Sequence, residues 1–286
     1  MGDLAILAAA IIWGSSFIIM KDTLSSVPTF YLLAIRFIPA SVILALIGIR
    51  ELRRINLTYI KYGVISGLLL IMAYVLQTLG LNATTPGKNA FLTTVYCIIV
   101  PFLYWLFTKR KPDKHNVIAA WLSLIGIGLI SLDRDLSMNY GDILTLFGGF
   151  FFACHIVALA KATKECGVLL LTMIQFITAG IVALIGGMIF ETFPTAIPAS
   201  AVTGLLYLSV MATALCLLLQ SIGQKYTHPS SAAVLLTLES VFGAALSVLL
   251  GRDKPSVRLF AGFTVMFISV LITETKLSFL KKKNKI

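Results

Sequence analysis

The sequence predicts an all-α polytopic membrane protein, in which ten transmembrane helices form two inverted-topology repeats of five helices each. Three observations carry this prediction: the apolar composition, ten apolar runs, and residues that recur at fixed spacings in the two halves. Of the 286 residues, 58% are hydrophobic and 12% are charged, whereas about 25% of the residues in soluble chains are charged. This composition argues against a soluble enzyme, a disordered protein and a nucleic-acid-binding protein.

Each expected helix is an apolar run, and a bilayer span takes about 20 residues. The first run lacks a preceding basic segment and is long enough to span, so we expect a retained helix and not a cleaved signal peptide. The fourth run opens at Pro86, a favourable first-turn residue. In chain order the runs are Leu4–Met20, Pro28–Ile49, Tyr62–Gly80, Pro86–Phe107, Val117–Leu132, Asp142–Ala160, Val168–Phe190, Ala201–Ile222, Pro229–Leu250 and Val257–Thr273.

The charged loops predict the orientation of the chain. With a cytoplasmic N-terminus, the segments on the inner side hold 16 Lys and Arg residues and those on the outer side hold 6. Cytoplasmic loops carry the excess of positive charge in membrane proteins. We therefore expect a multi-pass protein of the cell membrane with both termini in the cytoplasm and a basic tail over residues 276–286.

The second half of the sequence repeats the first. The spacing is 139 residues at the start of the halves and 143 residues further on, so an insertion of four residues lies between the seventh and eighth runs. Paired residues include Asp3 with Asp142, Trp13 with Phe152, Ser16 with His155, Arg36 with Gln175, Gln77 with Gln220, Pro86 with Pro229 and Thr94 with Thr237. We predict one repeat over residues 1–135 and another over 140–275. Because five spans are an odd number, the second copy enters from the opposite face, which is typical of secondary transporters.

Several motifs carry a resemblance to a known family. They are Trp13-Gly14-Ser15-Ser16-Phe17, Arg36-Phe37, the stretch from Thr84 to Pro101, His228-Pro229-Ser230-Ser231-Ala232-Ala233 and Glu239-Ser240-Val241-Phe242. On these residues the chain resembles the ten-helix EamA type of the drug/metabolite transporter superfamily. It departs from that pattern at Ser240, where the family usually has Pro, and at Gly251-Arg252-Asp253, where Gly-Glu is common.

The resemblance implies a secondary transporter of small metabolites, with amino acids or related compounds as the first expectation and export as the direction. The expected mechanism is alternating access, with a central cavity lined by the first, third, fourth, sixth, eighth and ninth helices. If transport is coupled to protons, Glu239 or His155 is expected to carry the proton; uniport is the alternative. An intramembrane enzyme acting on a lipid or isoprenoid is the competing interpretation.

Polar side chains within the runs are the candidate functional residues, because polar groups inside a bilayer are costly unless they are paired. Each of them has a structural alternative, such as an interhelical hydrogen bond or a buried ion pair. The candidate cavity residues are Trp13, Ser16, Tyr74, Gln77, Lys88, Asn89, Thr93, Tyr96, His155, Gln175 and Gln220. The candidate coupling residues are Glu239, His155 and Arg36.

The remaining expectations concern partners and chemistry. We expect no catalytic residues, no cofactor and no metal, because the acids, histidines and four cysteines are scattered and no nucleotide-binding or hydrolase motif is present. The expected partners are a small-molecule substrate and the lipid bilayer, without nucleic acid. Both a monomer and a homodimer are compatible with the sequence.

Overall fold

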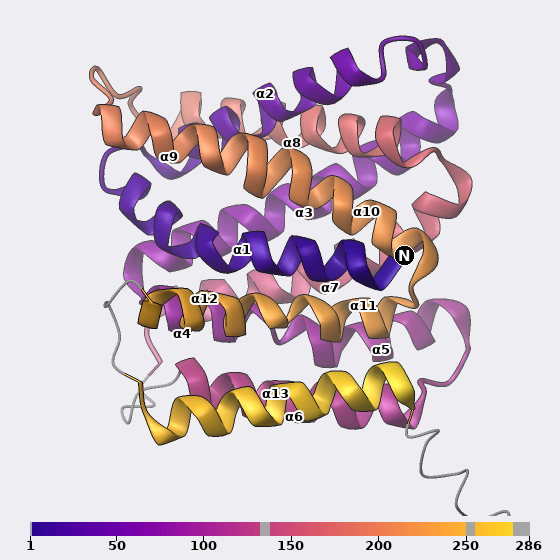
Figure 1. The fold of residues 1–286 in the computed structure, drawn as a ribbon. Helices are drawn as coiled ribbons and strands as arrows, with labels where there is room; N and C mark the ends of the chain where they lie inside the picture. The colour runs from indigo at the N-terminus through magenta and orange to yellow at the C-terminus, as the bar shows by residue number, and fades with distance from the viewer. Residues whose placement is uncertain (1, 132–137, 250–254, 277–286) are drawn as a thin grey trace, which may run out of the picture.

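Figure 1 shows the computed structural model of the protein, which describes residues 2–131, 138–249 and 255–276. Within these residues every regular element is helical. In order they are α1 (Gly2–Leu24), α2 (Thr29–Ile47), the short η1 (Leu52–Arg54), α3 (Leu57–Ala83), α4 (Pro86–Thr93), α5 (Tyr96–Thr108), α6 (Lys114–Ser131), α7 (Tyr140–Glu165), α8 (Val168–Phe190), α9 (Ala199–Ser209), the π-helical η2 (Val210–Leu215), α10 (Cys216–Tyr226), α11 (Pro229–Leu236), α12 (Leu238–Leu249) and α13 (Val257–Thr275).

The helices confirm the all-α, polytopic fold class. In the described part of the chain, eight helical segments have the length and hydropathy of a membrane span, and Lys114–Leu129 and Val257–Thr273 are shorter apolar helices. These segments occupy the ten predicted positions. Among the residues used to predict the orientation, Arg134, Arg252, Lys254 and the lysines after Lys276 lie outside the described residues.

Hydrogen bonds at the helix ends explain why two helices begin earlier than the hydropathy predicts. The Asn56 side chain accepts hydrogen bonds from the Thr58 and Tyr59 N–H groups, so α3 begins at Leu57. Asn139 and Asp142 form a reciprocal capping box, so α7 begins at Tyr140. Such caps satisfy backbone N–H groups that have no partner within the helix.

Two of the predicted spans are broken at paired positions. The fourth run divides into α4 and α5 next to Thr94, and the ninth divides into α11 and α12 at Thr237. At each break the threonine hydroxyl donates to the carbonyl oxygen three residues earlier, Phe91 O or Val234 O, at 2.6 Å. A threonine side chain can bond to the preceding turn in this way. The eighth run, predicted as one α-helix, contains η2 between α9 and α10.

The helices pack as a layered bundle (Figure 1). The α6 and α13 helices pack against each other at one edge, and α2 and α8 pack together at the opposite edge. Between them α1 packs against α10 and α12, while α7 packs against α3 and α5. The two central helices, α1 and α7, are thus the paired first helices of the two halves.

Glycines allow the central helices to cross closely at two paired places. Gly80 of α3 meets Gly141 of α7, where an added Cβ on Gly80 would lie 2.6 Å from the Gly141 carbonyl oxygen. Gly223 of α10 meets Gly2 of α1, where an added Cβ on Gly223 would lie 2.9 Å from the Gly2 carbonyl oxygen. Small residues permit such close backbone approach between membrane helices.

A threonine–aspartate hydrogen bond accompanies each crossing. Thr84 donates to Asp142 at 2.8 Å, and Thr227 donates to Asp3 at 2.6 Å. We call the first place, where α3 ends and α4 and α7 begin, the Asp142 end. The second, where α10 ends and α11 and α1 begin, is the Asp3 end.

Replacement of Gly80 with alanine tests the crossing. We expect Gly80→Ala to lower the free energy of unfolding by about 1–3 kcal/mol, because the added methyl group overpacks a backbone-to-backbone contact. The measurement is denaturant unfolding of the purified protein in detergent. Gly48→Ala is the matched control, since its Cβ would face the flexible Leu169 side chain at 3.0 Å. Equal losses in both variants would contradict a rigid crossing at Gly80.

Candidate functional site: a central cavity between the two halves

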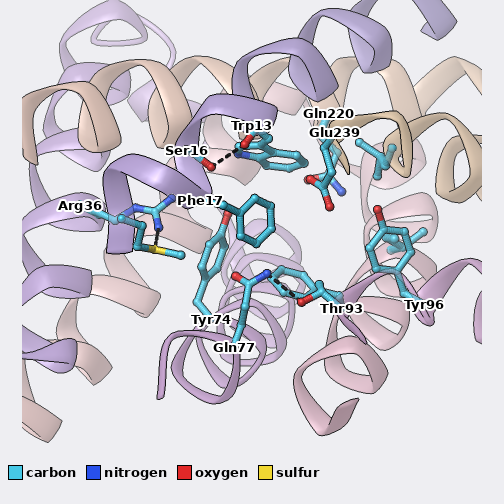
Figure 2. A pocket seen from close by; sticks show the side chains of 14 residues that line it. Trp13, Ser16, Phe17, Arg36, Tyr74, Gln77, Thr93, Tyr96, Gln220 and Glu239 are labelled. Carbon is cyan, nitrogen blue, oxygen red and sulfur yellow. Dashed lines mark hydrogen bonds between the residues drawn. The ribbon is translucent and has the colours of Figure 1, made fainter. Parts of the chain in front are cut away.

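A cavity lies among the central helices (Figure 2). Its empty volume, including the open space at its mouth, is about 490 Å³. The lining residues come from both halves of the chain. They are Trp13, Ser16, Phe17, Met20, Arg36, Tyr74, Gln77, Thr93, Tyr96, Phe152, Ile156, Gln220, Leu236 and Glu239.

The two helix breaks border this cavity. Thr93 ends α4 and Tyr96 begins α5, while their paired residues, Leu236 and Glu239, stand at the end of α11 and in the first turn of α12. All four residues line the cavity. The helix N-terminus beside Glu239 carries partial positive charge, which favours a carboxylate there.

Arg36 is the one cation among the lining residues. Its side chain is 1% exposed, and its guanidinium carbon lies 4.8 Å from the centre of the Tyr74 ring, a cation–π distance. The Arg36 Nε–H donates to the Thr213 hydroxyl at 3.0 Å, and Nη1 lies 3.2 Å from the Met20 sulfur. A guanidinium group has five N–H donors, so donors remain for a ligand in the cavity.

The π-helical segment η2 holds two of the lining residues in place. The Trp13 indole N–H donates to the Ala212 carbonyl oxygen at 2.7 Å, and Thr213 accepts from Arg36. Just before η2, the Ser209 hydroxyl donates to the Arg36 carbonyl oxygen at 3.0 Å. Single π-helical turns are frequent at functional sites, and this one fixes an aromatic ring and a cation at the cavity wall.

Glu239 is the one carboxyl group among the lining residues. It is 6% exposed and interacts with the Tyr96 hydroxyl. Figure 2 shows Glu239 near Gln220 and apart from Arg36, with Phe17 and Tyr74 between the two charged groups in this view. The Oε1 atom of Gln220 is buried without a hydrogen-bond partner among the described residues, so it can accept a hydrogen bond from a ligand.

The cavity brings together most of the predicted candidate residues. Of these, Trp13, Ser16, Tyr74, Gln77, Thr93, Tyr96 and Gln220 line it, as do the coupling candidates Arg36 and Glu239. Six helices were expected to line the cavity. Through Arg36, the second helix lines it as well. The roles of these side chains in binding and coupling stay predictions.

His155 and Gln175 lie outside the cavity lining. They bond to each other at 2.8 Å between His155 Nε2 and Gln175 Oε1, and so join α7 to α8. The residues of α7 that face the cavity are Phe152 and Ile156. His155 stands between these two residues in sequence, but its ring is directed to Gln175 of α8 and does not line the cavity. This contact is the structural alternative given above for buried polar residues, a hydrogen bond between two helices.

Lys88 and Asn89 also lie outside the lining, nearer the Asp142 end. Lys88 forms an ion pair with Asp142 at 2.6 Å. Asn89 Nδ2 donates to the Gln77 carbonyl oxygen at 3.0 Å and to the Thr145 hydroxyl at 2.8 Å. Both residues connect helices beneath the cavity.

Sequence reasoning missed the apolar part of the lining. Phe17, Met20, Phe152, Ile156 and Leu236 line the cavity but were not among the candidate residues. In a chain with 58% hydrophobic residues, an apolar side chain that faces a cavity looks like one that faces lipid. The pairing of Phe152 with Trp13 was the available signal for one of them.

The lining chemistry consists of one guanidinium group, one carboxyl group, hydroxyl and amide groups, and aromatic rings. In residues 2–131, 138–249 and 255–276, no group of three or more His, Cys, Asp and Glu residues could hold a metal ion. The arrangement can therefore bind a small polar solute by charge, hydrogen bonds and stacking.

The sequence agrees with a known family along almost its whole length. The family model described as "EamA-like transporter family" matches residues 1–132 and 139–275. The chain belongs to the EamA-like transporter family. This EamA-like protein is accordingly a multi-pass membrane transporter.

Relatives of this EamA-like transporter carry names of the same kind. An uncharacterized transporter of Archaeoglobus fulgidus is 29% identical over 95% of this chain and 85% of its own length. A second uncharacterized transporter of that organism is 24% identical over 93% of this chain and 94% of its own length. The uncharacterized inner membrane transporter YedA of Escherichia coli strain K12 is 25% identical over 96% of this chain and 91% of its own length.

The fold of this EamA-like transporter is also known from experiment. A solved crystal structure matches it with a TM-score of 0.82 over 98% of both chains. The two sequences are 15% identical, so this likeness shows the fold alone.

The support of Arg36 by η2 can be tested with Thr213→Val. We expect the free energy of unfolding to fall by about 1–3 kcal/mol, because a buried cation loses a hydrogen-bond acceptor. The readout is denaturant unfolding in detergent. Thr264→Val is the matched control, since the Thr264 hydroxyl is exposed and bonds within its own helix. A loss no greater than that of the control would show that Thr213 does not support Arg36.

Proposed function

We propose that this protein is a secondary transporter that exports small zwitterionic metabolites, with amino acids and related compounds as the substrate class. The observation that carries the proposal is the pair of opposite charges, Arg36 and Glu239, on different sides of one central cavity. Both the substrate class and the direction agree with what the sequence resemblance implied.

The charges of the lining favour a solute that is dipolar and has no net charge. Among the described residues, neither Arg36 nor Glu239 forms an ion pair with the other or with a third residue. A buried charge is costly unless it is paired. A carboxylate at Arg36 and an ammonium group at Glu239 would pair both charges, whereas a simple anion or cation would pair one of them.

The rest of the lining suits the apolar part of such a solute. Trp13, Phe17, Tyr74 and Phe152 provide aromatic surface, and Gln77, Thr93 and Gln220 provide hydrogen-bonding groups. Binding sites for small molecules combine apolar walls with a few polar groups that fix the orientation. An α-amino acid with an apolar or aromatic side chain fits this combination.

The place of the cavity supports alternating access. Its lining comes from α1 to α5 of the first half and from α7, α10, α11 and α12 of the second half. Inverted repeats that enclose a site near the membrane midplane can exchange conformations and expose that site to each side in turn. One chain contains the whole cavity, so a monomer would suffice.

Glu239 offers a means of coupling export to protons. A proton and a substrate ammonium group compete for the same carboxylate, so the two are carried in opposite directions. When the cavity faces the acidic outside, protonation of Glu239 releases the substrate; on the inside, loss of the proton admits the next one. For this scheme we propose a location in the cell membrane with both termini in the cytoplasm, which the distribution of Lys and Arg in the loops supports.

A thermal-shift screen in detergent tests the substrate class. We expect a saturable rise in the unfolding temperature with one or more amino acids, and no rise with the methyl ester or the N-acetyl derivative of the same compound. A ligand that binds only the folded state stabilises it by about 2.7 kcal/mol at 100 times its Kd. Trp13→Ala should abolish the rise.

The same screen includes nucleosides, nucleotide sugars, polyamines, quaternary amines, organic acids and isoprenoid lipids. Stabilisation by the ester or the N-acetyl derivative as strong as that by the free amino acid would contradict two-point recognition. Stabilisation by a lipid, followed by its chemical conversion, would favour the intramembrane enzyme instead.

Glu239→Gln tests proton coupling in proteoliposomes. We expect an imposed pH gradient to lose its effect on the rate of substrate movement, because the amide cannot exchange a proton. Glu191→Gln is the matched control, since Glu191 lies outside the cavity lining and accepts hydrogen bonds from the Phe30 and Tyr31 N–H groups. A gradient effect that persists in Glu239→Gln at the wild-type size would exclude Glu239 as the coupling group.

A further inference from the structure

A continuous set of hydrogen bonds leads from the cavity to the Asp142 end. The Gln77 side chain in the cavity wall donates to the Thr93 hydroxyl at 3.1 Å. Asn89 then joins the Gln77 carbonyl oxygen to the Thr145 hydroxyl, which connects α3, α4 and α7. These groups are almost fully buried, so the interface of the three helices is polar through its depth.

An ion pair completes this interface at the Asp142 end. Lys88 Nζ lies 2.6 Å from Asp142 Oδ2, and the same carboxylate accepts from the Thr84 hydroxyl at 2.8 Å and the Asn139 N–H at 2.8 Å. The Asp142 side chain is 0% exposed and that of Lys88 is 19% exposed. The carboxylate thus ties together the end of α3, the start of α4 and the start of α7.

The same three-helix interface occurs at the Asp3 end, formed by α10, α11 and α1. It has the matching glycine crossing, Gly223 with Gly2, and the matching hydrogen bond, Thr227 to Asp3 at 2.6 Å. The glycine crossing and the threonine–aspartate hydrogen bond therefore show that the two interfaces correspond to each other, as the spacing of the sequence also indicates.

Gln77 has the same residue, Gln220, at its paired position, but the paired interfaces differ in chemistry at four other positions of the set. Ser231 stands in place of Lys88, Ala232 in place of Asn89, Leu236 in place of Thr93 and Ile6 in place of Thr145. Among the described residues, Ala232, Leu236 and Ile6 have no side-chain polar group, and Ser231 accepts a hydrogen bond from Asn116 of α6 at 3.4 Å instead of forming an ion pair. Asp3 itself is exposed, whereas Asp142 is buried.

We propose that the Lys88–Asp142 ion pair is a gate that holds the substrate-free transporter closed at the Asp142 end. This inference rests on the alternating access proposed above. Opening of that end must separate α4 from α7 and so break the ion pair and the bonds of Asn89, whereas the described residues at the Asp3 end include no ion pair of Asp3 and no side-chain hydrogen bond of Ala232. The asymmetry between the halves favours the state that is closed at the Asp142 end.

The sign of the effect follows from the buried carboxylate. Removal of Lys88 leaves Asp142 buried without its cation when the gate is closed, but hydrated by water when the gate is open. A buried charge that loses its partner is strongly destabilising. Loss of Lys88 therefore shifts the population towards the state that is open at the Asp142 end.

The test exchanges the residues at the paired positions. Lys88→Ser gives the Asp142 end the residue of the other half, and Ser231→Lys does the reverse. Each is combined with Ser16→Cys, a change in the cavity wall, and labelled in oriented vesicles with a membrane-impermeant maleimide added from either side. Vesicles that lack Ser16→Cys give the background from the native cysteines.

With Lys88→Ser we expect the labelling rate from the Asp142 side to rise about tenfold or more, and the rate from the Asp3 side to fall. Lys88→Arg keeps the cation and should label like the parent. Ser231→Lys should lower the rate from the Asp3 side. Unchanged rates in Lys88→Ser would overturn the proposal.

A second readout covers the case in which Lys88→Ser folds poorly. Thr84→Val removes one hydrogen bond to Asp142 and should raise amide hydrogen exchange over residues 84–93 and 139–146, with no rise over residues 2–9 and 227–236. Equal rises at both ends would contradict a gate at the Asp142 end. Neither readout requires transport, so a labelling shift without substrate movement would count against the proposed function alone.

Discussion

The absence of water from the bilayer interior is the constraint on which this structure depends. A backbone or side-chain polar group at membrane depth is costly unless it finds a partner within the protein or lines a cavity. The helix ends show this directly. Glu191 accepts from the Phe30 N–H at 2.9 Å at the start of α2, and Lys21 donates to the Leu81 carbonyl oxygen at 2.6 Å at the end of α3. Each charge opposes the partial charge of the helix end that it meets.

The same constraint explains where a helix can depart from regular geometry. The breaks at Thr94 and Thr237 leave backbone groups that the threonine hydroxyls partly satisfy, and both breaks lie beside the cavity. The carbonyl oxygen of Ala212 in η2 accepts from Trp13. Irregular backbone inside a membrane is tolerated where it is buried in protein or lines a cavity. The irregularities of this fold therefore gather around its central cavity.

Much of the fold could be predicted from the sequence, because apolar runs of spanning length leave few alternatives in a bilayer. The two helices that break are those that carry the paired residues Pro86 with Pro229 and Thr94 with Thr237. The breaks themselves were not predicted, since hydropathy does not distinguish a continuous helix from two helices joined by a tight turn. For the same reason the early start of α3, which depends on the Asn56 cap, was missed.

The candidate site was predictable where a polar side chain had to face inward, as at Arg36, Gln77 and Glu239. For the other candidate residues, the rotation of each helix about its axis determines whether the side chain faces the cavity. His155 and Ile156 are neighbours in sequence but face different partners, and a hydropathy pattern does not fix that rotation. The apolar wall residues, such as Phe17 and Leu236, had no signal that separated them from lipid-facing side chains.

The π-helical segment has a consequence for the comparison of the two halves. A π-helical turn bonds residues five apart instead of four, so it accommodates one residue more than the α-helical turn it replaces. The span Ala199–Tyr226 accordingly has 28 residues, whereas the paired helix α3 has 27. An alignment of α3 with the span that contains η2, made without a gap, is therefore shifted by one residue on one side of η2. On that side it pairs residues whose directions around the helix differ by about 100°. The two halves should therefore be aligned separately on the two sides of this segment.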